Sequence, residues 1–380
     1  MEGRGTPDFL LLLMTFILVG FGIVMVYSAS SAIAAQNYND PFLLTKRQLI
    51  AAAVGAVMMI ILMNIRFTIW KKGYIPFFLI ILGLMIAVLA IPSEGKPRSW
   101  IDFGFLTLQP VEFAKLATIL YISSYIHRKG QQFQSFTRGL LPVSLIVALM
   151  TALIMMQPDF GSTVVFLLCC FILIIAGGAN LLQIFAGLMA TVSLSAILIG
   201  GALMLDLGDD REYQLKRFNC FIDPWHDTQG WCWQHVQAEI ALGHGGISGA
   251  GFGQSIQKLF YLPEAHNDFI FAIIGEEFGF ICVSLFILFL LLFIWRGIIV
   301  SLRCIDPYGT LLGIGIVGMF GIQSFVNIGG VTNIIPMTGI TLPFISSGGS
   351  SLLVSMMSMG ILLSISRNAN YSSQSTKDNS

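Results

Sequence analysis

The segment 257–277 concentrates the residues that could carry acid–base chemistry. It passes from a polar stretch with Lys258, Glu264 and His266 to a long apolar run that begins at Asp268. A carboxylate at the first turn of a membrane helix lies at the water boundary, where the helix dipole favours its charged form. Partial burial acts in the opposite direction and makes the carboxylate a better base. Asp268 is therefore a candidate general base; the alternative is that it only caps the helix.

Glu112 and Lys115 lie inside another apolar run and are three residues apart. Residues at this spacing share one face of a helix. Ionisable side chains within a membrane span usually face the bundle interior or a wet cavity. Two interpretations follow: a structural ion pair, or a polar cavity in which Lys115 meets an anionic group.

Two further polar segments could face the same site. Arg98 and Trp100 lie in the segment 93–107, where an indole among headgroups and a guanidinium on phosphate suit the membrane interface; an aromatic anchor is the alternative. The Ser/Gly cluster from Ser346 to Ser351 lies at or near membrane depth. Irregular backbone at that depth must be buried in protein or line a cavity, and close packing of helices through small residues is the alternative.

The segment 205–267 is the one large polar loop, and it carries Arg217. Its cysteines, Cys220 and Cys232, could pair in a disulfide if the loop faces an oxidising side. The glycine-rich run 243–253 lacks the spacing of a dinucleotide-binding fingerprint, so its glycines more plausibly let backbone approach backbone or a ligand. Asp159 precedes another apolar run and is better explained as a helix cap than as a catalytic group.

The composition predicts an all-α integral membrane protein with one helical bundle in lipid. The 380 residues are 56% hydrophobic and only 11% charged, whereas soluble domains carry about 25% charged residues. The 20 basic and 20 acidic residues balance, so there is no basic field that would indicate nucleic acid binding.

Ten apolar runs are long enough to span a membrane, since a span needs about 20 residues. The runs are 9–28, 47–64, 74–92, 108–126, 140–156, 162–178, 181–204, 268–295, 308–330 and 344–365. The polar tail 367–380 is predicted to be disordered.

The orientation follows from the basic residues in the short connections. With the amino terminus in the cytoplasm, eleven lie inside and four outside. The inside residues are Arg4, Arg66, Lys71, Lys72, Arg128, Lys129, Arg138, Arg296, Arg303, Arg367 and Lys377. Both termini are therefore predicted in the cytoplasm, and Asp268 faces outward. An outward site with a carboxylate, several cations and apolar walls suits a lipid-linked phosphate substrate.

Several motifs resemble those of the SEDS family (shape, elongation, division and sporulation), the FtsW/RodA/SpoVE group. The resemblance covers nearly the whole chain and is closer to the FtsW and SpoVE branches than to RodA. Its most specific pieces are Tyr261-Leu-Pro-Glu-Ala-His-Asn-Asp-Phe-Ile-Phe-Ala, Gln157-Pro-Asp-Phe-Gly-Ser and Asp223-Pro-Trp. The chain departs from the family at Asn267, where Thr is usual, at Phe260, which is acidic in some FtsW proteins, and at Trp231-Cys-Trp, which replaces a more usual Gly-Tyr pattern.

The resemblance implies a single SEDS-type domain over 1–380, with ten spans, that polymerises lipid II on the outer face of the bacterial cytoplasmic membrane. Such glycosyltransferases pair with a class B penicillin-binding protein, which crosslinks the glycan. The family's essential carboxylate falls on Asp268 and its functionally sensitive Trp on Trp100. The buried Glu and Lys of its fourth span fall on Glu112 and Lys115.

The expected reaction starts with Asp268 taking a proton from the 4-hydroxyl of the acceptor sugar. The oxygen then attacks the growing chain, which leaves as undecaprenyl pyrophosphate. Cations should stabilise that leaving group: the candidates are Arg98, Lys115, Arg217 and Lys258, with a divalent cation, Mg or Mn, whose ligands the sequence does not identify. Further candidate substrate contacts are Trp100, Glu112, Glu264, His266, Ser346 and Ser347.

No organic cofactor is expected. Two alternatives from other functional classes stay open at the level of sequence. A lipid II flippase would use the same polar cavity as a transport path and leave lipid II unpolymerised. A non-catalytic scaffold would position the penicillin-binding protein and would tolerate substitution of Asp268.

Overall fold

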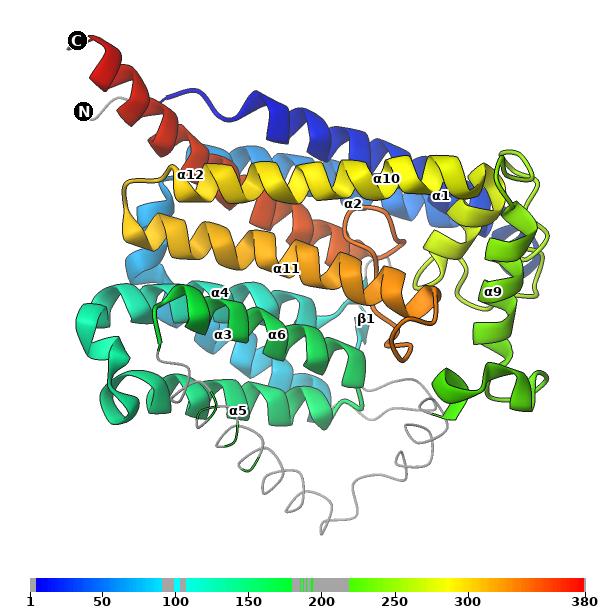
Figure 1. The fold of residues 1–380 in the computed structure, drawn as a ribbon, viewed down its shortest axis with the longest axis horizontal. Helices are drawn as coiled ribbons and strands as arrows, with labels where there is room; N and C mark the ends of the chain where they lie inside the picture. The colour runs from blue at the N-terminus through cyan, green and yellow to red at the C-terminus, as the bar shows by residue number, and fades with distance from the viewer. Residues whose placement is uncertain are drawn as a thin grey trace.

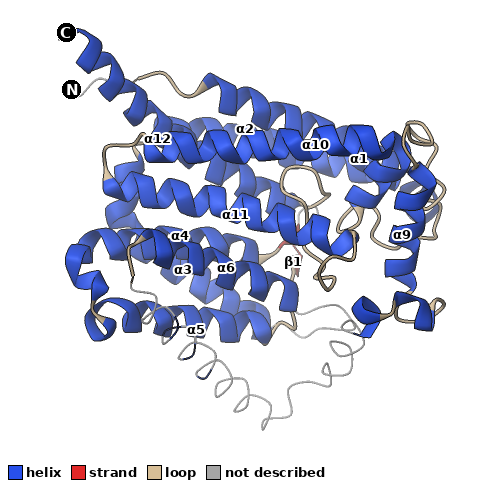
Figure 2. Ribbon diagram, viewed as in Figure 1, coloured by secondary structure: helices blue, strands red, loops and turns tan. Residues whose placement is uncertain are grey.

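Long helices lie side by side along one direction in the computed structural model (Figure 1). The structure describes residues 5–90, 99–102, 107–179 and 219–378, with four isolated positions at 185, 187, 189 and 193. In these residues the one sheet is a two-residue antiparallel pair, β1 (Ile101–Asp102) with β2 (Thr107–Leu108) (Figure 2). The all-α class predicted from the composition is confirmed.

Nine of the ten predicted spans coincide with a helix in the described residues. The seventh, 181–204, lies outside the described residues except at the isolated helical positions. The helices are α1 (Phe9–Tyr38), α2 (Leu43–Asn64), α3 (Trp70–Ala90), α4 (Pro110–Lys129), α5 (Leu141–Met155), α6 (Phe160–Ala176), α9 (Trp233–Gly245), α10 (Ile270–Leu302), α11 (Pro307–Val331) and α12 (Gly349–Asp378). Short turns of other helix types are η1 (Phe67–Ile69), η2 (Gly130–Gln134), η3 (Phe136–Leu140) and η4 (Pro224–Asp227).

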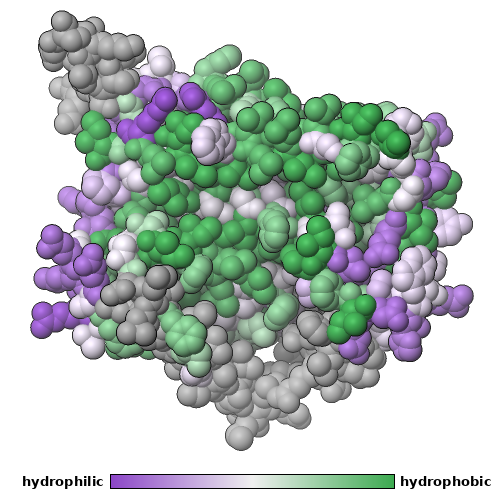
Figure 3. All heavy atoms as spheres, in the orientation of Figure 1, coloured by the Kyte–Doolittle hydropathy of each residue, from purple (hydrophilic) through white to green (hydrophobic). Residues whose placement is uncertain are grey.

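The outer surface of the bundle identifies a multi-pass membrane protein. Seven helices among the described residues are long and apolar enough to cross a membrane, and α6 is a shorter apolar helix. On α10, the side chains of Phe280, Leu285 and Trp295 are each at least 60% exposed, which suits lipid and not water. Hydrophobic residues cover the middle of the molecule, and hydrophilic residues gather at its two ends (Figure 3). The exact count of ten spans stays a prediction.

Aspartates begin three of these helices by capping their free backbone N–H groups. Asp8 accepts from the backbone N–H of Leu11 at 3.0 Å and so caps α1. Asp159 accepts from the backbone N–H of Ser162 at 2.9 Å, which confirms its predicted role as a cap. Asp306 caps α11 in the same way.

Different parts of the chain lie at the two ends of the bundle. The chain termini lie together at one end, and α9 with the turn before α10 lies at the other (Figure 1). At the terminal end, Arg296 pairs with Asp8 at 2.6 Å, and the guanidinium of Arg367 donates to the carbonyl of Gly5 at 3.0 Å. The tail that the sequence predicts to be disordered continues α12 as helix to Asp378.

Helix α12 forms the centre of the bundle. It contacts α1, α2, α4, α10 and α11, and its Met356, Met359 and Leu363 have no exposed surface. Small residues allow the closest approach: a Cβ added at Gly360 would lie 2.6 Å from the carbonyl oxygen of Met59 on α2.

Helix α10 is broken at Gly279, whose φ of 74° and ψ of −179° are not helical. A break in a membrane helix leaves backbone groups unpaired, and each such group costs several kcal/mol in lipid. Here the glycine-rich loop supplies the partners. The N–H of Ala250 donates to the carbonyl of Glu276 at 2.9 Å, and the N–H of Phe280 donates to the carbonyl of Gly246 at 2.9 Å. The predicted approach of backbone to backbone at these glycines is confirmed.

The break generates a prediction for Gly279→Ala. The added Cβ would lie 2.2 Å from the backbone nitrogen of Gly249, on a φ that side chains rarely adopt. We expect a loss of about 3 kcal/mol in the free energy of unfolding, measured as a lower thermal midpoint of the protein in detergent. Gly20→Ala is the matched control, because nothing lies within 4 Å of its added Cβ. Equal midpoints for the two variants would contradict this account of the break.

Candidate functional site

Asp268 lies at the end of a turn-rich segment, two residues before α10 begins at Ile270. Its side chain is partly buried. The N-cap position of α10 is Phe269, the residue directly after Asp268. The carboxylate stands at the α9 end of the bundle, where the apolar helices meet polar loops.

The backbone on either side of Asp268 is fixed by two elements distant in sequence. The side-chain amide of Asn327, on α11, donates to the carbonyl of Asp268 at 2.8 Å and to that of Ile340 at 2.6 Å. The hydroxyl of Ser346 donates to the carbonyl of Asn267 at 2.7 Å. Asn327 is not among the site residues predicted from the sequence, since a lone Asn in an apolar run carries no spacing signal.

The first half of the Ser/Gly cluster, Ser346 to Gly348, is irregular backbone that is buried or partly buried in protein, and the second half begins α12. Ser346 also accepts from the N–H of Leu342 at 2.8 Å. Its carbonyl accepts from the side chain of Gln48, on α2, at 3.1 Å. Ser350 donates to the carbonyl of Thr107 in β2 at 2.9 Å. The cluster therefore ties α2 and β2 to the segment that carries Asp268.

Ser347 and His266 meet through their backbones, because the N–H of Ser347 donates to the carbonyl of His266 at 2.9 Å. Burial lowers the pKa of the His266 imidazole, and the nearby Glu264 carboxylate acts weakly in the opposite direction. Protonation therefore needs a lower pH than for a free histidine, and the ring is mainly neutral at pH 7. Its Nδ1 is buried and has no hydrogen-bond partner in the described part of the chain.

Glu112 and Lys115 form a buried ion pair, with 2.7 Å between carboxylate and ammonium. Lys115 is 1% exposed and Glu112 5%. Both residues lie on one face of α4, as their spacing predicted, and they pair as the first of the two interpretations expects. A contact between Lys115 and an anionic group stays a prediction.

The remaining candidates are spread over the α9 end. Trp100 precedes β1 and is 41% exposed. Glu264 is exposed and accepts a hydrogen bond from the side chain of Asn267. Arg98 and Arg217 lie outside the described residues.

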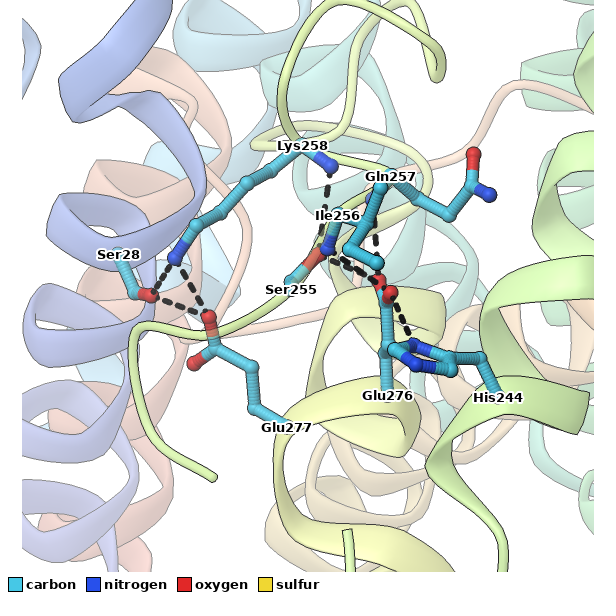
Figure 4. A network of polar contacts seen from close by, with 8 residues as sticks. All are labelled: Ser28, His244, Ser255, Ile256, Gln257, Lys258, Glu276 and Glu277. Carbon is cyan, nitrogen blue, oxygen red and sulfur yellow. Dashed lines mark hydrogen bonds and ion pairs between the residues drawn. The ribbon is translucent and has the colours of Figure 1, made fainter. Parts of the chain in front are cut away.

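The position of Lys258 differs from the expectation that its ammonium contacts the leaving pyrophosphate. This lysine is 6% exposed, and its ammonium lies 2.7 Å from the carboxylate of Glu277 and 3.0 Å from the hydroxyl of Ser28 (Figure 4). The charge of Lys258 is thus neutralised inside the protein. The sequence showed both residues, but the break in α10 that brings them together is not visible in a hydrophobicity pattern.

No group of three or more His, Cys, Asp or Glu side chains gathers as a cation site in the described ranges. These residues therefore do not offer a protein-only site for the expected Mg or Mn ion, and no step of the chemistry is assigned to a metal.

Cys220 and Cys232 form a disulfide, with their Cα atoms 5.2 Å apart. The bond joins the segment before η4 to the start of α9. The sequence alone leaves this pairing open, because two cysteines in one loop do not by themselves reveal the redox compartment.

Comparison with known proteins gives one consistent family. Residues 9–371 match the FtsW/RodA/SpoVE family, described as cell cycle protein. The chain is 38% identical to stage V sporulation protein E of Bacillus subtilis, over 97% of this chain and 99% of that protein. It is also 38% identical to a probable peptidoglycan glycosyltransferase FtsW of Trichlorobacter lovleyi, over 98% of this chain and 96% of that protein.

Solved structures share the fold. A chain described under "Structural coordination of polymerization and crosslinking by a peptidoglycan synthase complex" matches with a TM-score of 0.74 and 26% identity, over 96% of this chain and 98% of that chain. The rod shape determining protein RodA of Thermus thermophilus matches with a TM-score of 0.66 and 24% identity, over 95% of this chain and 97% of that chain.

The hydrogen bonds of Ser346 predict the effect of Ser346→Ala. The variant leaves the part-buried carbonyl of Asn267 and the buried N–H of Leu342 without this partner, which should cost about 1–3 kcal/mol of stability. Thermal unfolding measures the loss. Ser284→Ala is the control, because Ser284 is exposed and donates only to Phe280 of its own helix. A midpoint no lower than that of the control would contradict the supporting role.

Thiol counting tests the disulfide. The chain has six cysteines, of which Cys169, Cys170, Cys282 and Cys304 are free. Denatured, unreduced protein should therefore take up four maleimide–polyethylene glycol adducts, and reduced protein six. Labelling of all six without reduction would show that Cys220 and Cys232 are not bonded in the cell.

Proposed function

Because the chain belongs to the FtsW/RodA/SpoVE family of cell cycle proteins, we propose that it is a peptidoglycan glycosyltransferase that polymerises lipid II. Several relatives at 36–38% identity are named probable peptidoglycan glycosyltransferase FtsW. The observation that carries the proposal is the placement of Asp268. Its carboxylate stands at the polar end of an apolar bundle, on a backbone fixed by Asn327 and Ser346.

Asp268 acts as general base in the proposed reaction. It accepts the proton of the 4-hydroxyl of the acceptor sugar as that oxygen attacks the anomeric carbon of the growing chain. The bond from that carbon to undecaprenyl pyrophosphate breaks, and the pyrophosphate takes the electron pair. A single inverting displacement needs one base, unlike the paired carboxylates of hydrolytic glycosidases. The fixed backbone at Asp268 serves this step, because small errors in position are costly in rate.

The pyrophosphate gains negative charge as it leaves, so nearby cations should stabilise it. Arg98 and Arg217 are the proposed contacts. Trp100, Glu264, His266, Ser346 and Ser347 are the proposed residues around the sugar and the lipid headgroup. The proposal includes a divalent cation, Mg or Mn, which is added in the assay and to which no protein ligands are assigned.

The site faces the outside of the bacterial cytoplasmic membrane, with both termini in the cytoplasm. Two observations support this orientation. Basic residues of the short connections are concentrated at the terminal end, as cytoplasmic segments require. The disulfide lies at the α9 end, and disulfides persist in oxidising compartments.

A class B penicillin-binding protein is the proposed partner. The fold likeness to a chain of a peptidoglycan synthase complex, at 26% identity, supports this assignment. Division or sporulation is the proposed setting, since the relatives include both an FtsW protein and a sporulation protein.

The decisive test is Asp268→Asn in a polymerisation assay. Purified protein, with and without a cognate class B partner, is mixed with labelled lipid II and Mg or Mn, and the glycan products are separated on a gel. We expect a ladder from the wild type and a loss of about 100-fold or more in rate from the variant, because general-base catalysis contributes about 100- to 10,000-fold.

Asp40→Asn is the matched control. Asp40 is a carboxylate in the connection between α1 and α2 and pairs only with Lys46 in the described residues. Full activity in Asp268→Asn would overturn its role as base. No ladder from the wild type with any partner would favour the flippase or the scaffold, and a liposome translocation assay would distinguish these two.

A further inference from the structure

Two adjacent carboxylates, Glu276 and Glu277, lie beside the break in α10 and are 0% and 1% exposed. Each accepts hydrogen bonds from the segment 244–258, which precedes the turn carrying Asp268 (Figure 4). Buried carboxylates are costly unless they are paired and hydrogen-bonded. These contacts therefore define where that segment lies.

Glu276 fixes the backbone of the segment. Its carboxylate accepts from the N–H of Ile256 at 2.9 Å and from the hydroxyl of Ser255. It also lies 2.9 Å from Nδ1 of His244, at the end of α9. The carboxylate thus joins α10 to α9 and to the turn at 255–257.

Glu277 holds Lys258, the residue that follows this turn, through an ion pair. Its Oε1 lies 2.7 Å from the ammonium of Lys258 and accepts from the hydroxyl of Ser28, on α1, at 2.6 Å. The ammonium also donates to Ser28 at 3.0 Å. Three parts of the chain that are far apart in sequence meet at this ion pair.

The segment between Lys258 and Asp268 is short and held along its length. The N–H of Leu262 donates to the carbonyl of Gln257 at 2.9 Å, and the indole of Trp233 donates to the carbonyl of Tyr261 at 2.7 Å. Leu262 and Ala265 have no exposed surface. The segment is thus anchored at one end by the Lys258–Glu277 pair and at the other by Ser346 and Asn327.

We propose that Lys258 and Glu277 are positioning residues for Asp268. The pair fixes the start of the segment 258–268, and through it the place of the catalytic carboxylate relative to the acceptor hydroxyl. This inference rests on the proposed glycosyltransferase function and replaces the sequence-based expectation that Lys258 contacts the pyrophosphate. The ammonium meets Glu277 and Ser28 inside the protein, so it acts on the reaction through the backbone that follows it.

The test compares Lys258→Met, Glu277→Gln and the double variant in steady-state polymerisation of lipid II. Each single variant should lower kcat by about 10-fold or more at a KM within about threefold of wild type, because small displacements of a catalytic group cost up to about 100-fold. The double variant should recover part of kcat above either single variant, since it leaves no buried charge unpaired.

Lys71→Met is the matched control. Lys71 forms an ion pair with Asp306 at 2.7 Å at the terminal end of the bundle, so its loss should leave kcat unchanged. Hydrogen–deuterium exchange of ligand-free protein gives a readout independent of activity. Residues 259–269 should exchange faster in the Lys258 and Glu277 variants than in the wild type, and at the wild-type rate in Lys71→Met.

Wild-type kcat and wild-type exchange in Lys258→Met would overturn the proposal. A raised KM at unchanged kcat, with no recovery in the double variant, would also overturn it, because Lys258 would then contact the substrate directly. If the single variants do not fold, the double variant is compared with wild type: slower turnover and faster exchange at 259–269 support the proposal, and wild-type values overturn it. If the wild type makes no polymer, the proposed function fails, and the exchange measurement still decides whether the pair positions the segment.

Discussion

Backbone hydrogen bonding inside lipid is the constraint on which the rest of the structure depends. A membrane helix can be interrupted only where protein supplies the missing partners. The break at Gly279 of α10 meets this condition because the glycine-rich loop lies against it. The N–H of Ala250 in the loop donates to a carbonyl of α10, and the N–H of Phe280 in α10 donates to a carbonyl of the loop. The loop is therefore an integral part of the α10 helix region, although it precedes the break at Gly279 by more than twenty residues.

The same constraint gathers the polar groups of the candidate site. A second irregular stretch, Ser346 to Gly348, lies against the turn before α10, and each satisfies backbone groups of the other. Irregular backbone from two parts of the chain thus converges beside Asp268. Buried charges follow the same logic on the other side, where Glu277 and Lys258 neutralise each other. The backbone that carries Asp268 is therefore held on one side by hydrogen bonds and on the other by the Lys258–Glu277 ion pair.

The sequence predicted local features well and distant pairings poorly. Helical spacing placed Glu112 and Lys115 on one face, and the residue type of Asp159 indicated a cap, because both depend on neighbours within one turn. The importance of the segment around Asp268 followed from its mixture of charge and apolar residues. The contacts of Asn327 and of Lys258 depend on how separate helices pack and on a break at one glycine, which no periodicity reveals. The disulfide could not be predicted, because the sequence does not show that Cys220 and Cys232 lie close together in the fold.

The central place of α12 has a consequence for how the bundle is made. This helix follows the other helices in the chain and contacts five of those in the described residues. During synthesis, α2 and its neighbours therefore enter the membrane before the element that fills the space between them exists. Ser346, one of the supports for the backbone before Asp268, lies just ahead of that last helix and follows the others in synthesis. Until α12 inserts, the membrane holds an incomplete bundle, and the segment that carries Asp268 lacks its hydrogen bond to Ser346.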